Sequence, residues 1–199
     1  MEKQKTKKQM KIIIVINLLL LLIFPVFQAQ AQTDSKFRVV LDYKYMFGLR
    51  EQGDFWDLSR KDAKMYGNSL RLSCLYSLFS QLSAGVGIGA DRYEVPGRNT
   101  IPVFVVAHYS PKMKLPIYFF GNAGFSFKTE TITPGFLMDL GIGYKYMFRK
   151  HFGLSFQFGY NLKQFKEESS IFNLYDGSWS YLTGKQTRHS LTCGIGLVF

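Results

Sequence analysis

The last thirteen residues of the sequence, 187–199, follow a two-residue repeat that constrains the fold more than any other stretch. Alternate positions on one side are mostly apolar and end in an aromatic: Thr187, His189, Leu191, Cys193, Ile195, Leu197 and Phe199. The positions between them are polar or small, apart from Val198. Successive side chains of a strand point to opposite faces, so the repeat predicts a strand with one apolar and one polar face. A transmembrane barrel strand has this pattern, and so does an edge strand of a soluble sandwich.

The same stretch resembles the assembly signal at the end of bacterial outer-membrane barrels. That signal has a polar residue, a glycine two places on, a hydrophobic residue, and a terminal aromatic separated from it by one position. The matching residues are Thr192, Gly194, Leu197 and Phe199. The resemblance implies handling by the barrel-assembly machinery and favours the barrel interpretation over the sandwich.

The start of the sequence has the three parts of an export signal. An apolar run, Ile12 to Phe24, ends at Pro25, and Ala29-Gln30-Ala31 supplies a small-x-small cleavage pattern. The basic part before the run contains Lys3, Lys5, Lys7, Lys8 and Lys11. The apolar run is shorter than the roughly twenty residues a membrane-spanning helix needs, which favours cleavage over an uncleaved anchor. We predict a signal peptide at 1–31 and a barrel formed by 32–199.

The charge and aromatic content of the mature chain favour a membrane barrel over a nucleic-acid-binding domain. The formal net charge is +11, and removing five lysines and Glu2 with the signal leaves +7. The basic residues are scattered and accompany no nucleic-acid-binding motif. Attraction to lipopolysaccharide and other anionic outer-membrane lipids explains them better. The 19 Phe and 12 Tyr residues are an excess that fits aromatic girdles at two membrane interfaces.

Eight segments of the mature chain alternate in this way. They lie at about 36–49, 67–78, 82–89, 100–109, 115–127, 134–147, 152–162 and 187–199. The connections after the second, fourth and sixth segments are short, whereas 50–66 and 163–186 are expected to be long loops. Outer-membrane barrels have an even strand count and alternate short periplasmic turns with longer outside loops. The predicted fold is an all-β, eight-stranded antiparallel up-and-down transmembrane β-barrel.

Several strand motifs support this fold. They are 99–104 (NTIPVF), 120–127 (FGNAGFSF), 140–146 (LGIGYKY) and the terminal Phe199. Together they resemble the outer-membrane protein β-barrel domain family, and the architecture is similar to the small OmpA/OmpX-type barrels. The resemblance covers the whole mature chain and implies the outer membrane of a Gram-negative cell envelope. Its motifs mark barrel strands, so it implies fold more strongly than function.

No group of residues predicts a catalytic, cofactor-binding or metal site. The histidines His108, His151 and His189 are too few and too dispersed to bind a metal. A barrel enzyme that modifies lipid A would need a base and a nucleophile at the membrane surface. His189 and Ser190 are adjacent, but neighbouring strand residues point to opposite faces. We therefore predict a non-enzymatic barrel, with an enzyme as the minor alternative.

The polar face of the predicted strands indicates a charged lumen. Its candidate network is Arg38, Asp42, Lys44, Arg71 and Asp139. Charges in a narrow lumen are costly unless they pair, so opposite signs at similar depth should satisfy one another. With Phe104, Tyr118 and Phe120 also inside, we predict a lumen plugged by side chains. A narrow, porin-like solute or ion channel is the alternative.

The two long connections carry aromatic residues that are candidate surface contacts: Phe55, Trp56, Phe172, Tyr175 and Trp179. Exposed aromatics can anchor a binding partner, although they can also pack together or lie at the lipid interface. The sequence thus predicts a structural or surface-interaction role with an extracellular or envelope partner, and it names no ligand.

Overall fold

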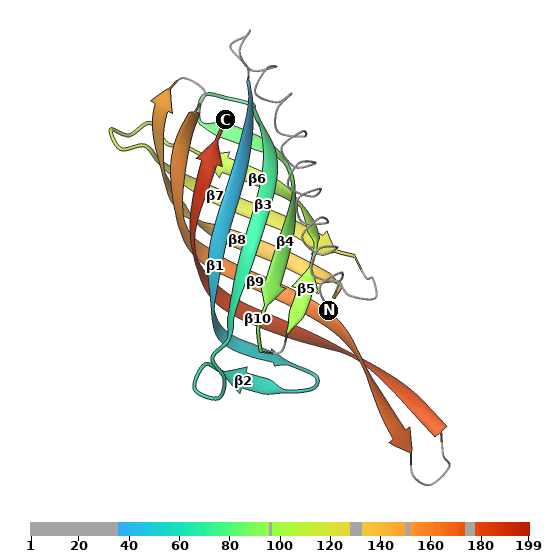
Figure 1. Cartoon of the computed structure of the whole chain (residues 1–199). Helices are drawn as coiled ribbons and strands as arrows, with labels where there is room; N and C mark the ends of the chain where they lie inside the picture. The colour runs from blue at the N-terminus through green and yellow to red at the C-terminus, as the bar shows by residue number, and fades with distance from the viewer. Residues whose placement is uncertain (1–35, 96, 128–132, 150–151, 174–177) are drawn as a thin grey trace, which may run out of the picture. The chain divides into compact units, whose positions relative to one another are not determined.

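Eight long antiparallel strands follow one another around the sheet, and the last pairs with the first (Figure 1). They are β1 (Phe37–Gly53), β3 (Tyr66–Ser77), β4 (Leu82–Tyr93), β6 (Pro102–Tyr109), β7 (Ile117–Ser126), β8 (Gly135–Arg149), β9 (Phe152–Asn173) and β10 (Ser178–Val198). Two short strands, β2 (Asp57–Ser59) and β5 (Arg98–Thr100), pair with β1 and β4. The computed structural model describes residues 36–95, 97–127, 133–149, 152–173 and 178–199. The predicted signal peptide lies outside these residues.

The seam between β1 and β10 closes the barrel. Their pairing runs from Val40 opposite Val198 to Gly53 opposite Gln186. Because the first and last long strands are hydrogen-bonded, the eight long strands leave no open edge along this seam. The predicted fold class, a closed eight-stranded antiparallel barrel, is confirmed.

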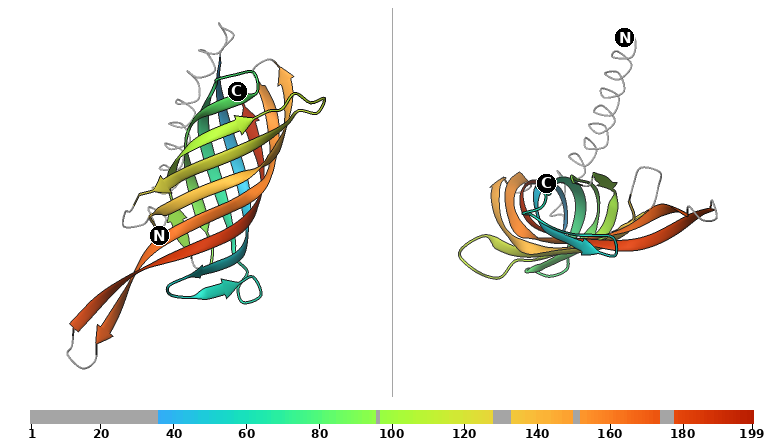
Figure 2. Two further views of the ribbon diagram at one scale, coloured as in Figure 1. Left: turned by 180° about the vertical axis from the view of Figure 1, so that it is seen from behind. Right: turned by 90° about the horizontal axis from the view of Figure 1, so that it is seen from below.

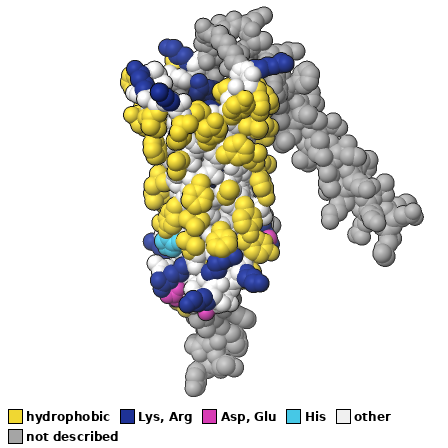
Figure 3. Space-filling view, turned by 90° about the vertical axis from the view of Figure 1, so that its left-hand side faces the viewer, with side chains coloured by type: hydrophobic (Ala, Val, Ile, Leu, Met, Phe, Trp, Pro, Cys, Tyr) yellow, Lys and Arg dark blue, Asp and Glu magenta, His cyan; other side chains and the backbone are white. Residues whose placement is uncertain are grey.

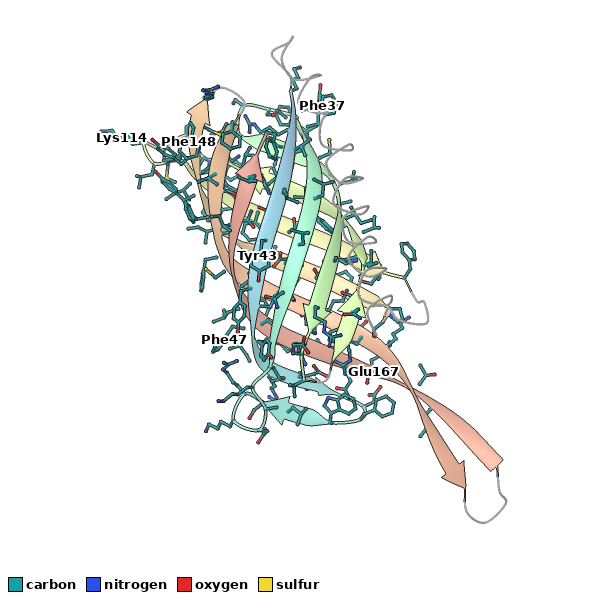
Figure 4. The ribbon with its side chains drawn as sticks, viewed as in Figure 1. Phe37, Tyr43, Phe47, Lys114, Phe148 and Glu167 are labelled. Atoms are coloured by element: carbon teal, nitrogen blue, oxygen red, sulfur yellow. The ribbon has the colours of Figure 1, made fainter. Side chains whose placement is uncertain are left out.

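The two faces of the barrel wall have opposite chemistry. Large apolar side chains lie on the outside, including Val86 and Val105, each 61% exposed, and Phe125, 60% exposed. Tyr43 and Phe47 lie on the outer face of β1 (Figure 4). On the face seen in Figure 3, hydrophobic side chains form a band between two ends where Lys and Arg gather. The inward-facing side chains are largely polar or charged, which is the arrangement of a membrane-spanning barrel.

The connections differ in length at the two ends of the barrel. The strand ends near Phe37 and Phe199 are joined by three connections, 78–81, 110–116 and 150–151. At the other end the chain forms the loop that holds β2, the β4–β5 turn, and the connections from β7 to β8 and from β9 to β10. Part of these connections lies outside the described residues. The strand limits agree with the predicted alternation except between β9 and β10, where only residues 174–177 lie between the strands. In the described ranges, no helix is long and apolar enough to cross a membrane.

The predicted loop at 163–186 is wrong, because most of it belongs to strands. β9 continues to Asn173 and β10 begins at Ser178, with pairing from Lys163 opposite Arg188 to Asn173 opposite Ser178. β8 pairs with β9 only as far as Lys163, and β1 pairs with β10 only as far as Gln186. The segments 167–173 and 178–184, here called the ribbon, therefore project beyond the barrel wall (Figures 1 and 2). Strict apolar alternation is lost in much of this segment, whereas the backbone pairing between β9 and β10 continues through it.

Removing Phe199, or replacing it with lysine, is expected to impair barrel assembly. Phe199 exchanges backbone hydrogen bonds of 2.8 and 3.1 Å with Val39, and its ring lies 5.8 Å from that of Phe152. It is thus the last paired residue of the closing seam. We expect a lower yield of folded barrel in the membrane fraction and loss of heat-modifiable migration. Phe79→Lys, at an exposed turn of the same end, is the control. Equal yields of the wild-type protein, both Phe199 variants and Phe79→Lys would contradict the expectation.

Candidate functional site

A cluster of charged side chains lies in the middle of the barrel lumen around Asp139 of β8. The Asp139 carboxylate is fully buried and accepts hydrogen bonds from Lys44 Nζ at 2.7 Å and Arg71 Nη1 at 2.6 Å. Asn122 Nδ2 donates a third at 3.2 Å. These donors come from β1, β3 and β7, so one carboxylate connects four strands across the lumen. Charge-assisted hydrogen bonds of this length are among the stronger interactions in proteins.

Arg71 also contacts a second acid, Asp91, which the sequence analysis missed. Arg71 Nη2 lies 3.6 Å from Asp91 Oδ2, and Arg71 Nε donates to Ser69 Oγ at 2.9 Å. Ser69 in turn donates to Asp91 Oδ1 at 2.5 Å. Asp91 was missed because the predicted strand ended at Gly89. The inward alternation of β4 continues two residues further, and extending it would have placed Asp91 in the lumen.

Two residues of the predicted lumen network stand apart from this cluster. Asp42 is buried, but its hydrogen bond comes from Gln157 Nε2 at 2.8 Å, and not from Lys44 or Arg71. Arg38 is exposed and makes no hydrogen bond to the other four residues among the described contacts. It lies four residues closer to the end of β1 than Asp42, so its side chain reaches the mouth instead of the middle of the lumen.

Aromatic rings fill the lumen beside the charged cluster. Phe104, Tyr118 and Phe120 are 2%, 1% and 4% exposed, and all three point inward. Each ring lies against a glycine of another strand. A Cβ atom at Gly87 would come within 2.5 Å of the Phe104 ring, and one at Gly141 would come within 2.6 Å of the Phe120 ring. The inward glycines therefore make room for these rings.

A second buried charged cluster lies at the outer end, around Glu51 of β1. Its carboxylate accepts hydrogen bonds from Arg188 Nε at 2.6 Å, Arg98 Nη1 at 2.8 Å and Trp56 Nε1 at 3.0 Å. Glu51 is fully buried, and the Arg98 and Arg188 side chains are 4% and 1% exposed. Arg98 also pairs with Glu167, where the ribbon leaves the barrel (Figure 4). The cluster thus connects β1, β5, β9 and β10.

Arg188 also holds the β4–β5 turn at the outer mouth. Its Nη1 donates to the carbonyl of Glu94 at 3.0 Å, and its Nη2 donates to the carbonyl of Val95 at 2.6 Å. Val95 has a φ of 51°, a left-handed conformation that is uncommon for a β-branched residue. The sequence does not predict this cluster, because Glu51 and Trp56 lie in the segment 50–66 that was expected to be a loop. Arg188 was placed on the polar face of its strand, but no partner was assigned to it.

The lumen holds more hydrogen-bonding groups than protein partners for them. At least thirteen buried side-chain nitrogen and oxygen atoms of the described residues have no partner in the protein. One of them, Asp91 Oδ2, has the 3.6 Å ion pair with Arg71 in its place. A buried polar atom left dry costs about 1–3 kcal/mol. Several such dry atoms would together offset much of the free energy of folding of a typical domain, about 5–15 kcal/mol.

The outer loops hold part of the predicted surface-contact set. Phe55 lies against Gly184 of β10, and Trp56 is bound to Glu51 instead of standing free. Phe172 and Trp179 lie on the strands of the ribbon, and their side chains, like all of Tyr175, lie outside the described residues. Near Trp56, the Ser59 hydroxyl and amide donate to the Asp62 carboxylate and lower its pKa.

The remaining predicted residues have separate positions on β10. Thr192 and Gly194 face the lumen side, Leu197 lies near the end of the seam, and Phe199 follows it. His189 contacts the hydroxyl of Tyr160, whereas Ser190 is buried in the lumen, so they lie on opposite faces. Among the described residues, no group of three His, Cys, Asp or Glu side chains is placed to bind a metal ion.

No protein-family model and no curated protein matches the sequence. Among solved structures, the outer membrane protein AlkL in DMPC lipid bilayers is similar, with 13% identity over 85% of this chain and 93% of AlkL and a TM-score of 0.47. Neisserial surface protein A has 14% identity over 81% of this chain and 96% of that chain, with a TM-score of 0.45. The outer membrane protease OmpT from Escherichia coli has 9% identity over 84% and 98%, with a TM-score of 0.39.

The class of the protein follows from its own geometry. The closed eight-stranded wall, the outward apolar band and the polar lumen define a small transmembrane β-barrel of the outer-membrane type. A closed barrel satisfies every ladder hydrogen bond within the membrane, which an open sheet cannot do. The protein is an integral outer-membrane protein in contact with membrane lipid.

Proposed function

We propose that this protein is a non-enzymatic outer-membrane barrel that is closed to ions and solutes and acts through its outer end. The observation that carries the proposal is the pair of buried charged clusters at different depths of the lumen, around Asp139 and Glu51. A permeating ion would have to displace Lys44 or Arg71 from Asp139, and Arg98 or Arg188 from Glu51. Each displacement would leave a buried charge without its partner, which is costly.

The size of the barrel supports closure. An eight-stranded barrel has an interior that side chains can fill. Here Phe104, Tyr118 and Phe120 occupy the lumen, and the β4–β5 turn is bound to Arg188 at the outer mouth. The competing function, a narrow ion or solute channel, would require a path past both clusters. A closed lumen predicts no steady ionic current through the purified protein.

The outer end offers the surface for an interaction. The ribbon carries backbone groups that pair with no other strand of the barrel, and such edges can add a strand from a partner. Aromatic residues of the ribbon would supply anchors. We further propose that lipopolysaccharide or anionic lipid surrounds the basic rim, that 1–31 is removed on export, and that the assembly machinery recognises the closing strand.

A non-enzymatic role is supported by the position of the one neighbouring His–Ser pair. His189 contacts Tyr160 and Ser190 faces the lumen, so the imidazole cannot take a proton from the hydroxyl without a change of face.

Deleting the outer ribbon is expected to abolish partner binding while leaving the barrel assembled. Glu168 and Thr183 are register partners, so residues 169–182 can be replaced by an Asn-Gly turn that joins the two strands directly. Intact and shortened proteins would be compared for binding to extracellular matrix, glycans and envelope proteins. Heat-modifiable migration checks that the shortened barrel is folded. A shortened protein that binds everything the intact protein binds would contradict the surface role.

A further inference from the structure

The unpartnered polar atoms of the lumen form a connected row across four strands. Ser190 of β10 is the register partner of Asn161 of β9, Asn161 is the partner of Asp139 of β8, and Asp139 is the partner of Asn122 of β7. Each of the four carries a buried atom without a hydrogen-bond partner in the protein: Ser190 Oγ, Asn161 Nδ2, Asp139 Oδ1 and Asn122 Oδ1. The Cα atoms of directly opposed residues in a sheet lie about 4.5–5.5 Å apart, so the side chains of neighbours in this row are close enough to share a bound water.

The row is extended by further unpartnered atoms toward both mouths. Toward the outer end, both amide atoms of Gln186 and the hydroxyl of Thr100 are buried without partners, and Thr100 is the register partner of Asp91. Toward the other end, Nδ1 of the buried His108 has no hydrogen-bond partner in the protein. Unpartnered atoms therefore occur on both sides of this row, and one of them, His108 Nδ1, belongs to a ring that lies beside Tyr118 and Phe120.

We propose that the lumen contains a hydrogen-bonded file of water molecules that connects its two mouths and lets water, but not hydrated ions, cross the barrel. Water is the ligand whose chemistry fits, because it both donates and accepts, as this mixture of amide, hydroxyl and carboxylate atoms requires. Water is also small enough to lie between the side chains that fill the lumen, and buried polar groups without protein partners commonly bind it. The two charged clusters continue to exclude ions.

Osmotic shrinkage of vesicles tests the proposal. Purified protein would be reconstituted into phospholipid vesicles, and light scattering would be followed after mixing with a hyperosmotic, impermeant sugar solution. We expect faster shrinkage than in protein-free vesicles, in proportion to the amount of barrel, with no ionic current from the same preparation. Shrinkage at the protein-free rate would overturn the water path and leave the closed barrel standing. Fast shrinkage together with ionic current would refute closure instead.

Gln186→Met provides the matched variant. Methionine has a similar volume, and the exchange removes two unpartnered atoms without removing a hydrogen bond to the protein. A hydrated lumen predicts slower water passage and no gain in thermal stability, because bound water loses its partners. A dry lumen predicts unchanged passage and a higher melting temperature, because buried polar atoms are removed at no cost. Gln52→Met, at an exposed position of β1, is the control, and Ser190→Ala is a second lumen variant. A higher melting temperature for both lumen variants would overturn the proposal.

Discussion

Replacing Glu51 with alanine is expected to lower the free energy of unfolding by about 3–5 kcal/mol, because it removes one partner of a buried charged group. Arg98 and Arg188 both donate to the Glu51 carboxylate, and both would be left buried beside a cavity. Trp56 would lose its acceptor as well. Unfolding in urea, followed by heat-modifiable migration and tryptophan fluorescence, measures the change.

Asp57→Ala is the control for Glu51→Ala. It breaks the ion pair between Asp57 and Arg50, whose side chains are 55% and 54% exposed. Water replaces the lost contact, so the free energy of unfolding should change little. Because Arg188 also holds the β4–β5 turn, Glu51→Ala should make that turn more accessible to protease in intact cells. Equal stability of the Glu51 and Asp57 variants would mean that the outer cluster does not stabilise the barrel.

The second large effect is expected at the centre of the lumen. Asp139→Ala leaves Lys44 and Arg71 without their shared acceptor and should also cost about 3–5 kcal/mol. The double variant Lys44→Met/Asp139→Leu removes one charge of each sign, and Arg71 keeps Asp91 and Ser69 as neighbours. It should therefore be more stable than the single Asp139→Ala variant. A double variant less stable than the single one would show that the cluster is not organised by pairing at Asp139.

The sequence was sufficient for the wall of the barrel and for part of its interior. Two-residue alternation places Tyr43 outside and Lys44 inside, because a strand with lipid on one side must alternate. Position along each strand placed Asp42, Lys44, Arg71 and Asp139 at similar depth, and Lys44 and Arg71 do meet at Asp139. The sequence could not show that Asp42 bonds to Gln157 instead, because partners depend on strand tilt and stagger.

The rest could not be predicted because it lies where lipid no longer imposes a pattern. Glu51 follows the last apolar residue of β1, so its segment reads as a loop although residues 50–52 pair with both β10 and β2. The strands of the ribbon lack a strict apolar alternation over 167–173 and pair through their backbones, which leaves little periodic signal in the sequence. Arg98, on a short strand that pairs with β4, gains its role only when barrel closure lets its side chain reach Glu51 and Glu167.

The central claim is that the lumen is closed to ions, and planar-bilayer recording tests it most directly. Wild-type protein, purified and refolded, should give no steady current after insertion is verified. Arg71→Ala should destabilise the barrel without opening a large pore, because the aromatic rings and the outer cluster stay in place. A preparation from cells without the gene identifies currents from contaminating porins. Steady current that appears only with this protein and grows with its amount would contradict closure and favour a narrow channel.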